Sequence, residues 1–445
     1  MKPTKNIYDM NKEEIYTFIE KQIPIKTLEK NKYGEVFTSP ILINKMLDLF
    51  PPRVWTAYNM KWLDPSVGSG FFMIFVYLRL MEGLKSWQTN KHKRSQHIIQ
   101  NMLYMVELNK TNCKICKSLF GSNVNIFCGD FLVNIKFNNN DNDNIKETDV
   151  RFDCIIGNPP FQNYYGLTKD GKRVSGGKSK LYERIFLKSY SLLKNGGYLS
   201  FVVPDNIFAG NGSETYKTLI QNNIPFVSFN PLNQDYFGKI QQPVCYFILH
   251  KGETPGLTNI EHSDKLIFKL KLQNRPVNPI RDWTLHTEQL INKYVSNERN
   301  NVTYNRGKSV ASYKGNKYPI IFTPSKILQT NNSELAVGLG IKKAIIFSIS
   351  PDFSFKMDYS GEYGSGPNTF FIPFETNKQG KMLETFLKSK DYLTLALATK
   401  TSRQFLKIAF IEHLKLTKIM KTNKTRKHKK TKHKKNKKQK TLKNK

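Results

Sequence analysis

The tetrapeptide Asn158-Pro159-Pro160-Phe161 is the segment whose residue types most clearly suggest a chemical role. Two consecutive prolines fix the backbone and remove two N–H donors, which leaves carbonyl oxygens in a rigid array. The Asn158 side-chain oxygen and the Pro159 carbonyl can accept from one amino group, and Phe161 offers a flat face for a base. Two fixed acceptors favour a pyramidal amine, whose free lone pair can attack an electrophile. The segment therefore suits the transfer of a group to a nucleobase amine. The plainer alternative is a rigid loop with an incidental aromatic residue.

A second candidate lies in Asp64-Pro65-Ser66-Val67-Gly68-Ser69-Gly70, directly after a predicted strand. Ligands in open α/β sheets bind outside the carboxyl ends of the strands. Gly68 and Gly70 allow the backbone to approach a nucleoside closely, and Asp64 can hold a cationic group. A dinucleotide fingerprint would need glycine where Met73 stands. Taken alone, the segment fits a tight strand-to-helix turn as well as a cofactor loop.

Two further acids end the next two predicted strands. Glu107 can accept hydrogen bonds from ribose hydroxyls, and Asp130 from an adenine amino group, with Phe131 beside the ring. Individually, such acids are more often ordinary surface residues than ligands. Three acids at the ends of three successive strands indicate one nucleoside-binding edge.

These candidates need a parallel sheet that brings successive strand ends to one edge. Short apolar runs alternate with helix-like segments between residues 31 and 250, which predicts an α/β domain. Seven strands are expected, at residues 61–64, 102–107, 124–128, 152–157, 198–203, 225–229 and 244–249, with the last two antiparallel. Helices are expected over residues 71–83 and 181–193.

The rest of the chain differs in character from this α/β domain. Residues 1–30 predict a helical lead with Ile15, Phe18 and Ile19 on one face. After Lys251 the sequence becomes Asn- and Lys-rich with scattered β-like runs, so a mixed α+β domain is expected over residues 251–420. Residues 421–445 hold fourteen Lys and Arg and no acid, which predicts a disordered polybasic tail.

The 445-residue chain is strongly basic, with 70 Lys and Arg against 35 Asp and Glu and a net charge of +35. Without the fourteen charges of the tail, the net charge is still +21, which indicates a polyanionic partner and favours nucleic acid. No apolar run is long enough to span a bilayer, and the N-terminus lacks an apolar signal core. We therefore expect an intracellular protein, cytoplasmic or nuclear, with no membrane partner.

The five cysteines are too few for a disulfide scaffold in a chain of this length, which favours a reducing compartment. Cys113 and Cys116 have CxxC spacing, but no second pair of ligands follows to complete a zinc site. We expect these two to be ordinary small residues on a helix.

In order along the chain, these motifs resemble the DNA adenine-N6 methyltransferases of restriction–modification systems, in the group with the methyl-donor domain before the target-recognition domain. The resemblance rests on residues 34–40 (GEVFTSP), the 64–70 loop, Glu107, Asp130, and residues 158–161 followed by LYERIFLKSYSLLKNGGYLSFVVP. It covers residues 31–250 well, whereas the later segment matches in arrangement more than in motif.

The resemblance implies a Rossmann-like fold over residues 31–250 with a seven-stranded sheet, and S-adenosyl-L-methionine as cofactor. On that model, separate groups of residues hold the methionine part, its amino-acid end, the ribose and the adenine. Phe37, Thr38 and Pro40 would hold the methionine part, and Asp64, Gly68 and Gly70 its amino-acid end. Glu107 would hold the ribose, and Asp130 with Phe131 the adenine.

The resemblance also implies the reaction and the partners. Asn158, Pro159, Pro160 and Phe161 receive an adenine flipped out of double-stranded DNA, and no metal is needed. The domain over residues 251–420 recognises the DNA target, and a separately encoded restriction endonuclease is a candidate partner. A basic stretch after the tetrapeptide can contact phosphates, although a solvated loop fits equally: Lys169, Lys172, Arg173, Lys178 and Lys180.

Two other functions fit part of this pattern. Asn-Pro-Pro-aromatic also serves enzymes that methylate an RNA base or a protein glutamine amide. The Asp64-Pro65 opening of the loop, the Phe37-Thr38-x-Pro40 element and the large basic domain argue against that function. A non-catalytic DNA-binding relic of the fold is disfavoured by the intact tetrapeptide and the three strand-end acids.

Overall fold

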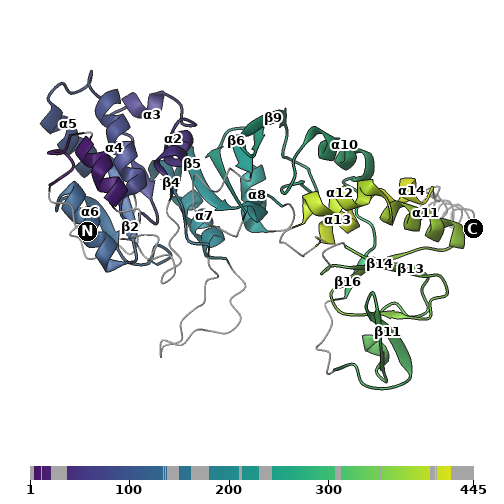
Figure 1. The fold of residues 1–445 in the computed structure, drawn as a ribbon. Coiled ribbons are helices and arrows are strands. Elements are labelled where there is room, and N and C mark those ends of the chain that lie inside the picture. Colours follow the sequence, from purple (N-terminus) through teal and green to yellow (C-terminus); the bar gives the residue numbers. More distant parts are fainter. Residues whose placement is uncertain are drawn as a thin grey trace, which may run out of the picture. The chain divides into compact units, whose positions relative to one another are not determined.

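The computed structural model divides into two compact units, residues 1–285 and 286–445. The structure describes residues 5–11, 13–21, 38–133, 135, 137, 150–161, 180–209, 213–229, 243–305, 312–349, 353–400, 406 and 408–421. Phe37, most of the basic stretch after the tetrapeptide and nearly all of the predicted tail lie outside these residues. Figure 1 shows the fold, with colours that follow the sequence.

The first unit is built on a sheet with strand order β3-β2-β1-β4-β5-β7-β6-β8-β9. All seven strands expected from the sequence are present: β1 Trp62–Asp64, β2 Leu103–Glu107, β3 Asn125–Cys128, β4 Phe152–Gly157, β5 Leu193–Pro204, β6 Asn223–Phe229 and β7 Val244–His250. Strands β1 to β5 pair in parallel, and β7 pairs antiparallel with both β5 and β6. The carboxyl ends of β1, β2, β3 and β4 therefore meet at one edge.

The expectation of seven strands is corrected to nine. Strand β8 (Thr258–His262) pairs in parallel with β6, and β9 (Lys265–Leu270) forms a hairpin with β8. A seven-stranded sheet would leave the backbone groups of β6 unpaired at its edge, and this hairpin satisfies them. The first unit consequently continues to Leu285, although the sequence pattern places the domain boundary at residues 250–251.

Helices cover both faces of the sheet because the strand residues alternate between two apolar clusters. Trp62 and Ile156 belong to one cluster, and their neighbours Leu63 and Ile155 belong to the other. The first face packs against α2 (Pro40–Leu47), α4 (Phe71–Gly83) and α6 (Lys110–Phe120), and the second against α7 (Leu181–Leu192) and α8 (Glu214–Ile220). Between α2 and β2 lie also α3 (Arg53–Thr56), α5 (Lys91–His97) and η1 (Ile98–Met102). This is a three-layer α/β fold.

The N-terminal segment packs against the first of these clusters. Residues 13–21 form a helix, and Ile15, Phe18 and Ile19 are all buried in the cluster. The amphipathic face expected from the sequence is therefore present. No helix in the described ranges is long and apolar enough to cross a membrane.

The second unit contains two small sheets and several helices. One sheet has the order β10-β16-β13-β14, and the other has the order β12-β11-β15. Their bounds are β10 Thr303–Asn305, β11 Tyr318–Thr323, β12 Lys326–Thr330, β13 Lys343–Phe347, β14 Phe355–Asp358, β15 Gly364–Ser365 and β16 Thr369–Pro373. The helices are α10 Leu285–Tyr294, α11 Asn377–Leu387, α12 Lys390–Thr399, α13 Ile408–Glu412 and α14 Leu416–Ile419.

Candidate functional site

Asp64 ends β1 and is fully buried beneath the loop that follows it. Its Oδ1 accepts a hydrogen bond from the Ser66 N–H at 3.0 Å, while Oδ2 has no hydrogen-bond partner among the described residues. Burial raises the pKa of Asp64 to about 8, the Ser66 N–H opposes this shift, and the charge of Glu107 adds to it. A buried carboxylate oxygen without a hydrogen-bond partner can accept from a cationic donor.

The loop after Asp64 depends on glycine at two positions. Gly68 and Gly70 have φ values of 58° and 92°, in the left-handed region that other residues avoid. Gly70 is also the N-cap of α4, and a Cβ there would lie 3.2 Å from the ring of Phe120. The loop backbone is thus held close to α6. The buried hydroxyls of Ser66 and Ser69 have no hydrogen-bond partner among the described residues.

Glu107, at the end of β2, ties this loop to the next one. Its Oε2 accepts from the Gly68 N–H at 2.7 Å, and its Oε1 accepts from the Asn109 N–H at 2.6 Å. The side chain is buried, with 8% of its surface exposed. Glu107 therefore fixes the loop backbone, and its contact with a ribose stays a prediction.

Asn158 follows β4 and is anchored to a distant part of the chain. Its Nδ2 donates to the Thr38 hydroxyl at 3.0 Å, across 120 residues of sequence. Thr38 is itself buried and precedes Ser39, the N-cap of α2, and Pro40, the first residue of that helix. Pro159 is buried, whereas Phe161 is half-buried and packs against the first apolar cluster.

One glycine joins the Asp64 side of the site to the Asn158 side. Gly157 is the last residue of β4, and a Cβ at this position would lie 2.7 Å from Asp64 Oδ1. The Asp64 carboxylate therefore lies close to the residue that directly precedes the tetrapeptide. The structure brings Thr38, Asp64 and Asn158 together at the edge where the sequence predicts them.

Asp130 and Phe131, which follow β3, are arranged differently from the expectation. Asp130 accepts from the Leu132 N–H at 2.8 Å and is half-exposed. Phe131 is 4% exposed and packs in the second apolar cluster, where Lys188 Nζ lies 5.6 Å from its ring centre. Its ring thus has core contacts of its own, and the roles of Asp130 and Phe131 toward an adenine stay predictions.

A buried polar group at the end of β5 was missed by the sequence reasoning. Asp205 directly follows Pro204, and its Oδ2 lies 2.5 Å from Arg281 Nη1. Burial raises the pKa of Asp205 to about 7, although Arg281 opposes the shift. The next residue, Asn206, accepts from the Tyr182 hydroxyl at 2.7 Å. The position of Asp205 directly after the fifth strand could have marked it as a candidate, but its partner Arg281, 76 residues away, could not have been predicted from the sequence.

The cysteine expectation is also corrected. Cys113 on α6 forms a disulfide with Cys128 at the end of β3, so Cys113 is more than a small residue on a helix. Cys116, the other half of the CxxC spacing, is a buried free thiol. Within the described ranges, no group of three His, Cys, Asp or Glu residues is placed to hold a metal.

Of the basic stretch after the tetrapeptide, Lys180 alone lies within the described residues. It caps α7 and forms a salt bridge with Glu183 at 3.3 Å. The expected phosphate contacts of the stretch stay predictions.

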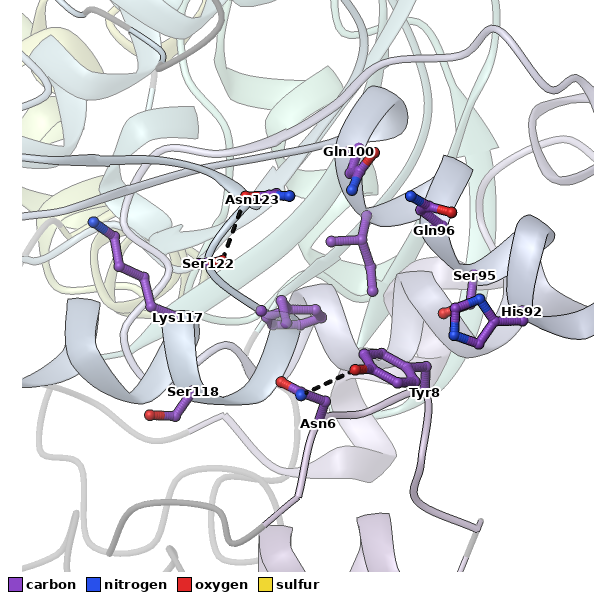
Figure 2. Close-up of a pocket in the computed structure, with 13 residues that line it drawn as sticks. Asn6, Tyr8, His92, Ser95, Gln96, Gln100, Lys117, Ser118, Ser122 and Asn123 are labelled. Atoms are coloured by element: carbon purple, nitrogen blue, oxygen red, sulfur yellow. Dashed lines mark hydrogen bonds between the residues drawn. The ribbon is translucent and has the colours of Figure 1, made fainter.

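A separate pocket lies near the amino ends of β2 and β3, away from the strand ends described above. It has a volume of about 340 Å³. Two of its lining residues are joined by the hydrogen bond drawn in Figure 2, in which Asn6 Nδ2 donates to the Tyr8 hydroxyl at 3.2 Å. Its other polar residues come from α5, η1, the end of α6 and the turn after it, among them His92, Gln100 and Lys117. None of the predicted cofactor or target residues lines this pocket.

Comparisons with known proteins agree with the motifs. Residues 71–232 match the family described as Eco57I restriction-modification methylase. An adenine-specific methylase of Mycoplasma pneumoniae is 26% identical over 329 residues, which cover 55% of this chain and 74% of the relative. Modification methylase CviBIII of Paramecium bursaria Chlorella virus NC1A is 24% identical over 249 residues, which cover 55% of this chain and 57% of that methylase.

A solved structure shares the fold over most of the chain. A nuclease-deletion mutant of the Type ISP restriction-modification enzyme LlaGI, in complex with a DNA substrate mimic, matches with a TM-score of 0.53 and 12% identity. The match covers 87% of this chain and 47% of that enzyme. Together, the family match and the two methylases confirm the resemblance to restriction–modification adenine methyltransferases, and they give no support to RNA or protein methylation.

Proposed function

We propose that this chain, which resembles the restriction–modification adenine methyltransferases, transfers a methyl group to the N6 amine of adenine at specific sites in double-stranded DNA. The observation that carries the proposal is the close approach of Gly157, the residue before Asn158, to the Asp64 carboxylate. It places the buried Asp64 carboxylate, whose Oδ2 has no described partner, near Asn158. The Asn158 side-chain oxygen and the Pro159 carbonyl can accept hydrogen bonds from an amine. A methyl donor bound at Asp64 and a target amine bound at Asn158 would therefore lie next to each other.

The described residues fit S-adenosyl-L-methionine as the methyl donor. Asp64 Oδ2 is a buried acceptor without a described partner, which suits the ammonium group of the methionine part. Gly68 and Gly70 let the loop pass close to that group, and Glu107 and Asp130 are the proposed ribose and adenine ligands. Thr38 and Pro40, together with Phe37, are the proposed closure over the methionine part. When bound, the cofactor supplies a methyl group activated by its positive sulfur.

Asn158 and Pro159 are proposed to orient the target amine. The Thr38 hydroxyl holds the Asn158 amide nitrogen, so the amide oxygen and the Pro159 carbonyl can both accept from one –NH2 group. These two acceptors favour the pyramidal amine, whose lone pair is no longer conjugated with the ring. Phe161 offers the stacking face, and the adenine must leave the duplex because its amine is otherwise paired. Positioning of the two reactants accounts for much of the rate.

The basic charge of the chain supports DNA as the partner. The second unit is the proposed target-recognition unit, and a separately encoded restriction endonuclease is a proposed further partner. We also propose an intracellular location, cytoplasmic or nuclear, where such DNA is present.

The test is methylation of duplex DNA by the purified chain with isotopically labelled S-adenosylmethionine. Nucleoside mass spectrometry is expected to show labelled N6-methyladenine, and sequencing should place it in one motif. Exclusive N4-methylcytosine would overturn the choice of base. Label found only in RNA or protein would overturn DNA as the substrate.

A further inference from the structure

An apolar turn is exposed on the second unit, ahead of β13. Leu339 and Ile341 alternate with Gly338 and Gly340 in this turn. Their side chains are 36% and 42% exposed, whereas the apolar residues of β13 are buried. Single exposed aliphatic residues are ordinary on protein surfaces, but two on one short turn make a patch that a partner can cover.

The backbone of the turn is fixed from several sides. Gly338 and Gly340 have φ values of 78° and 80°, which other residues rarely adopt. The Gly340 N–H donates to the Gly361 carbonyl at 2.8 Å, and Lys343 Nζ donates to the Ile341 carbonyl at 2.9 Å. Because the turn is already ordered, covering its side chains costs little conformational entropy.

Lys343 supports the turn from inside the unit. Its Nζ lies 2.7 Å from Asp358 Oδ2 and also donates to the Tyr363 carbonyl at 2.6 Å, and both charged side chains are fully buried. The Asp358 carboxylate in turn accepts from the N–H groups of Gly361 and Tyr363. This network connects β13, β14 and the 359–363 loop to the base of the exposed turn. The apolar pair is thus presented on a rigid support.

Three lysines come from the residue after the apolar pair and from the start of α11. Lys342 follows Ile341, and its Nζ donates at 3.3 Å to Asn377, the first residue of α11. Lys378 and Lys381 of the same helix line a shallow hollow of about 410 Å³ together with Asn377. No described carboxylate forms a salt bridge with any of the three lysines. Glu384 on α11 pairs with Lys388 at 2.6 Å, and the charge of Lys381 also helps to lower the pKa of Glu384.

We propose that Leu339, Ile341, Lys342, Lys378 and Lys381 form a surface that contacts duplex DNA. The aliphatic side chains meet base edges in a groove, where thymine methyl groups offer apolar contact, and the lysines meet phosphates. The inference rests on the proposed function, because it names the surface through which the second unit reads that substrate.

The charge of the unit favours DNA over a second copy of the chain as the occupant. Residues 286–421 contain twenty Lys and Arg and ten Asp and Glu, a net charge of +10. Two such surfaces would repel each other, whereas phosphates would attract both.

Two variants of the full chain test the two halves of the surface, with S-adenosylmethionine present. Leu339→Ala with Ile341→Ala should weaken binding to the cognate duplex about tenfold and relax the methylated motif at one or two positions. Lys342→Gln, Lys378→Gln and Lys381→Gln together should weaken binding to all sequences alike. This triple variant should flatten the slope of log K against log salt by about 0.9 for each phosphate that it no longer neutralises.

Matched controls lie elsewhere on the second unit. Leu393 and Leu397 on α12 are 40% and 37% exposed, so replacing both by alanine removes a similar apolar area. Lys314, Lys317 and Lys326 are exposed near the other sheet, and their conversion to glutamine removes the same charge. Thermal unfolding confirms that each variant is folded.

Equal effects in controls and tests, or an unchanged motif and slope, would overturn the proposed surface. An effect of Leu339→Ala and Ile341→Ala on sedimentation alone would assign the turn to self-association instead, and would also overturn it. Wild-type chain is assayed first: failure to methylate duplex DNA refutes the proposed function, whereas active wild type with indifferent variants refutes only this surface.

Discussion

Asn158 is the residue on which methyl transfer should depend most directly. Its amide nitrogen donates to the Thr38 hydroxyl, and its side-chain oxygen is proposed to accept from the target amine. We predict that Asn158→Ala lowers the turnover rate by about 10²–10³-fold, the range seen when one fixed hydrogen-bonding group is removed from a reacting centre. Cofactor affinity should be nearly unchanged, as measured by calorimetry. Near-normal turnover in this variant would show that the proposed mechanism is wrong.

Phe161→Ala provides the graded comparison for Asn158→Ala. The ring is half-buried and is proposed to stack on the flipped base. Its loss should cost about 1–3 kcal/mol of base binding and leave both acceptors in place. The expected rate therefore lies between those of the wild type and Asn158→Ala, with the larger change in the concentration of DNA needed for half-maximal rate.

Asp64 should make cofactor binding depend on pH. Burial holds its pKa at about 8, so the ligand-free carboxyl is largely protonated at pH 7. A bound ammonium group favours the charged carboxylate, and binding should therefore release a proton. We predict that affinity for S-adenosylmethionine rises by up to about tenfold per pH unit between about pH 6 and pH 8, then levels off.

Calorimetry in buffers of different ionisation enthalpy measures this proton release directly. Asp64→Asn should bind more weakly and without the pH dependence, whereas Asp205→Asn should retain it. The folded protein holds the Asp64 proton up to about pH 8, and the unfolded chain loses it near the ordinary value of 3.8. The free energy of unfolding of the ligand-free protein should thus fall as pH rises across that interval, and Asp64→Asn should flatten this decline. Proton uptake on binding would contradict the assignment.

The candidate residues could be named from the sequence because their chemistry is local. Asp64 is the last residue of β1 and Asn158 directly follows β4, so strand order alone brings them to one edge. The side-chain pairs around the site could not be predicted from the sequence, because the Thr38–Asn158 hydrogen bond and the Asp205–Arg281 salt bridge join residues far apart in sequence. Such pairs depend on the tertiary fold, and one sequence without its relatives carries no record of them.

The junction between β1 and β4 offers a test of how the two halves of the site are coupled. Gly157 ends β4, and any Cβ there would meet Asp64 Oδ1 at 2.7 Å. We predict that Gly157→Ala moves the carboxylate or the tetrapeptide, and that it impairs both cofactor binding and transfer. The overpacking should also lower the free energy of unfolding by about 1–3 kcal/mol.

Gly256→Ala is the matched control for Gly157→Ala. The nearest atom to its added Cβ is 3.4 Å away, and its φ is not in the left-handed region. Cofactor affinity, turnover and stability should all stay close to wild type. If Gly157→Ala impairs transfer while cofactor affinity is unchanged, the two halves of the site are not coupled through this contact.

Secondary structure was easier to predict than the membership of each strand in a sheet. The runs that became β1 to β7 are apolar and end in turn residues, so their pattern decides their conformation. Strands β8 and β9 fall after Gly252 and Gly256, where turn residues suggest a boundary. Pairing with β6 depends on an open sheet edge, which the sequence of the hairpin does not encode. The first unit therefore ends at Leu285, whereas the sequence pattern predicts an end at residue 250.

The charge distribution of the whole chain leads to a last prediction, on the polybasic tail. Deleting residues 421–445 removes fourteen cationic side chains and no acidic one. These side chains can meet phosphates, but a predicted disordered segment lacks the fixed geometry needed to read base edges. The deletion should therefore weaken binding to every DNA sequence alike and leave the methylated motif unchanged.

Salt dependence separates a DNA-binding tail from one that serves localisation or solubility. Each phosphate neutralised adds about 0.9 to the slope of log K against log salt, so a tail that meets several phosphates steepens that slope by several units. Full-length and truncated chains are compared on cognate and scrambled duplexes from low to physiological salt. We expect a flatter slope after truncation and an unchanged turnover rate at saturating DNA, because the candidate active-site residues precede Leu285. Identical slopes would exclude the tail from the complex, and an altered motif would give it a part in recognition.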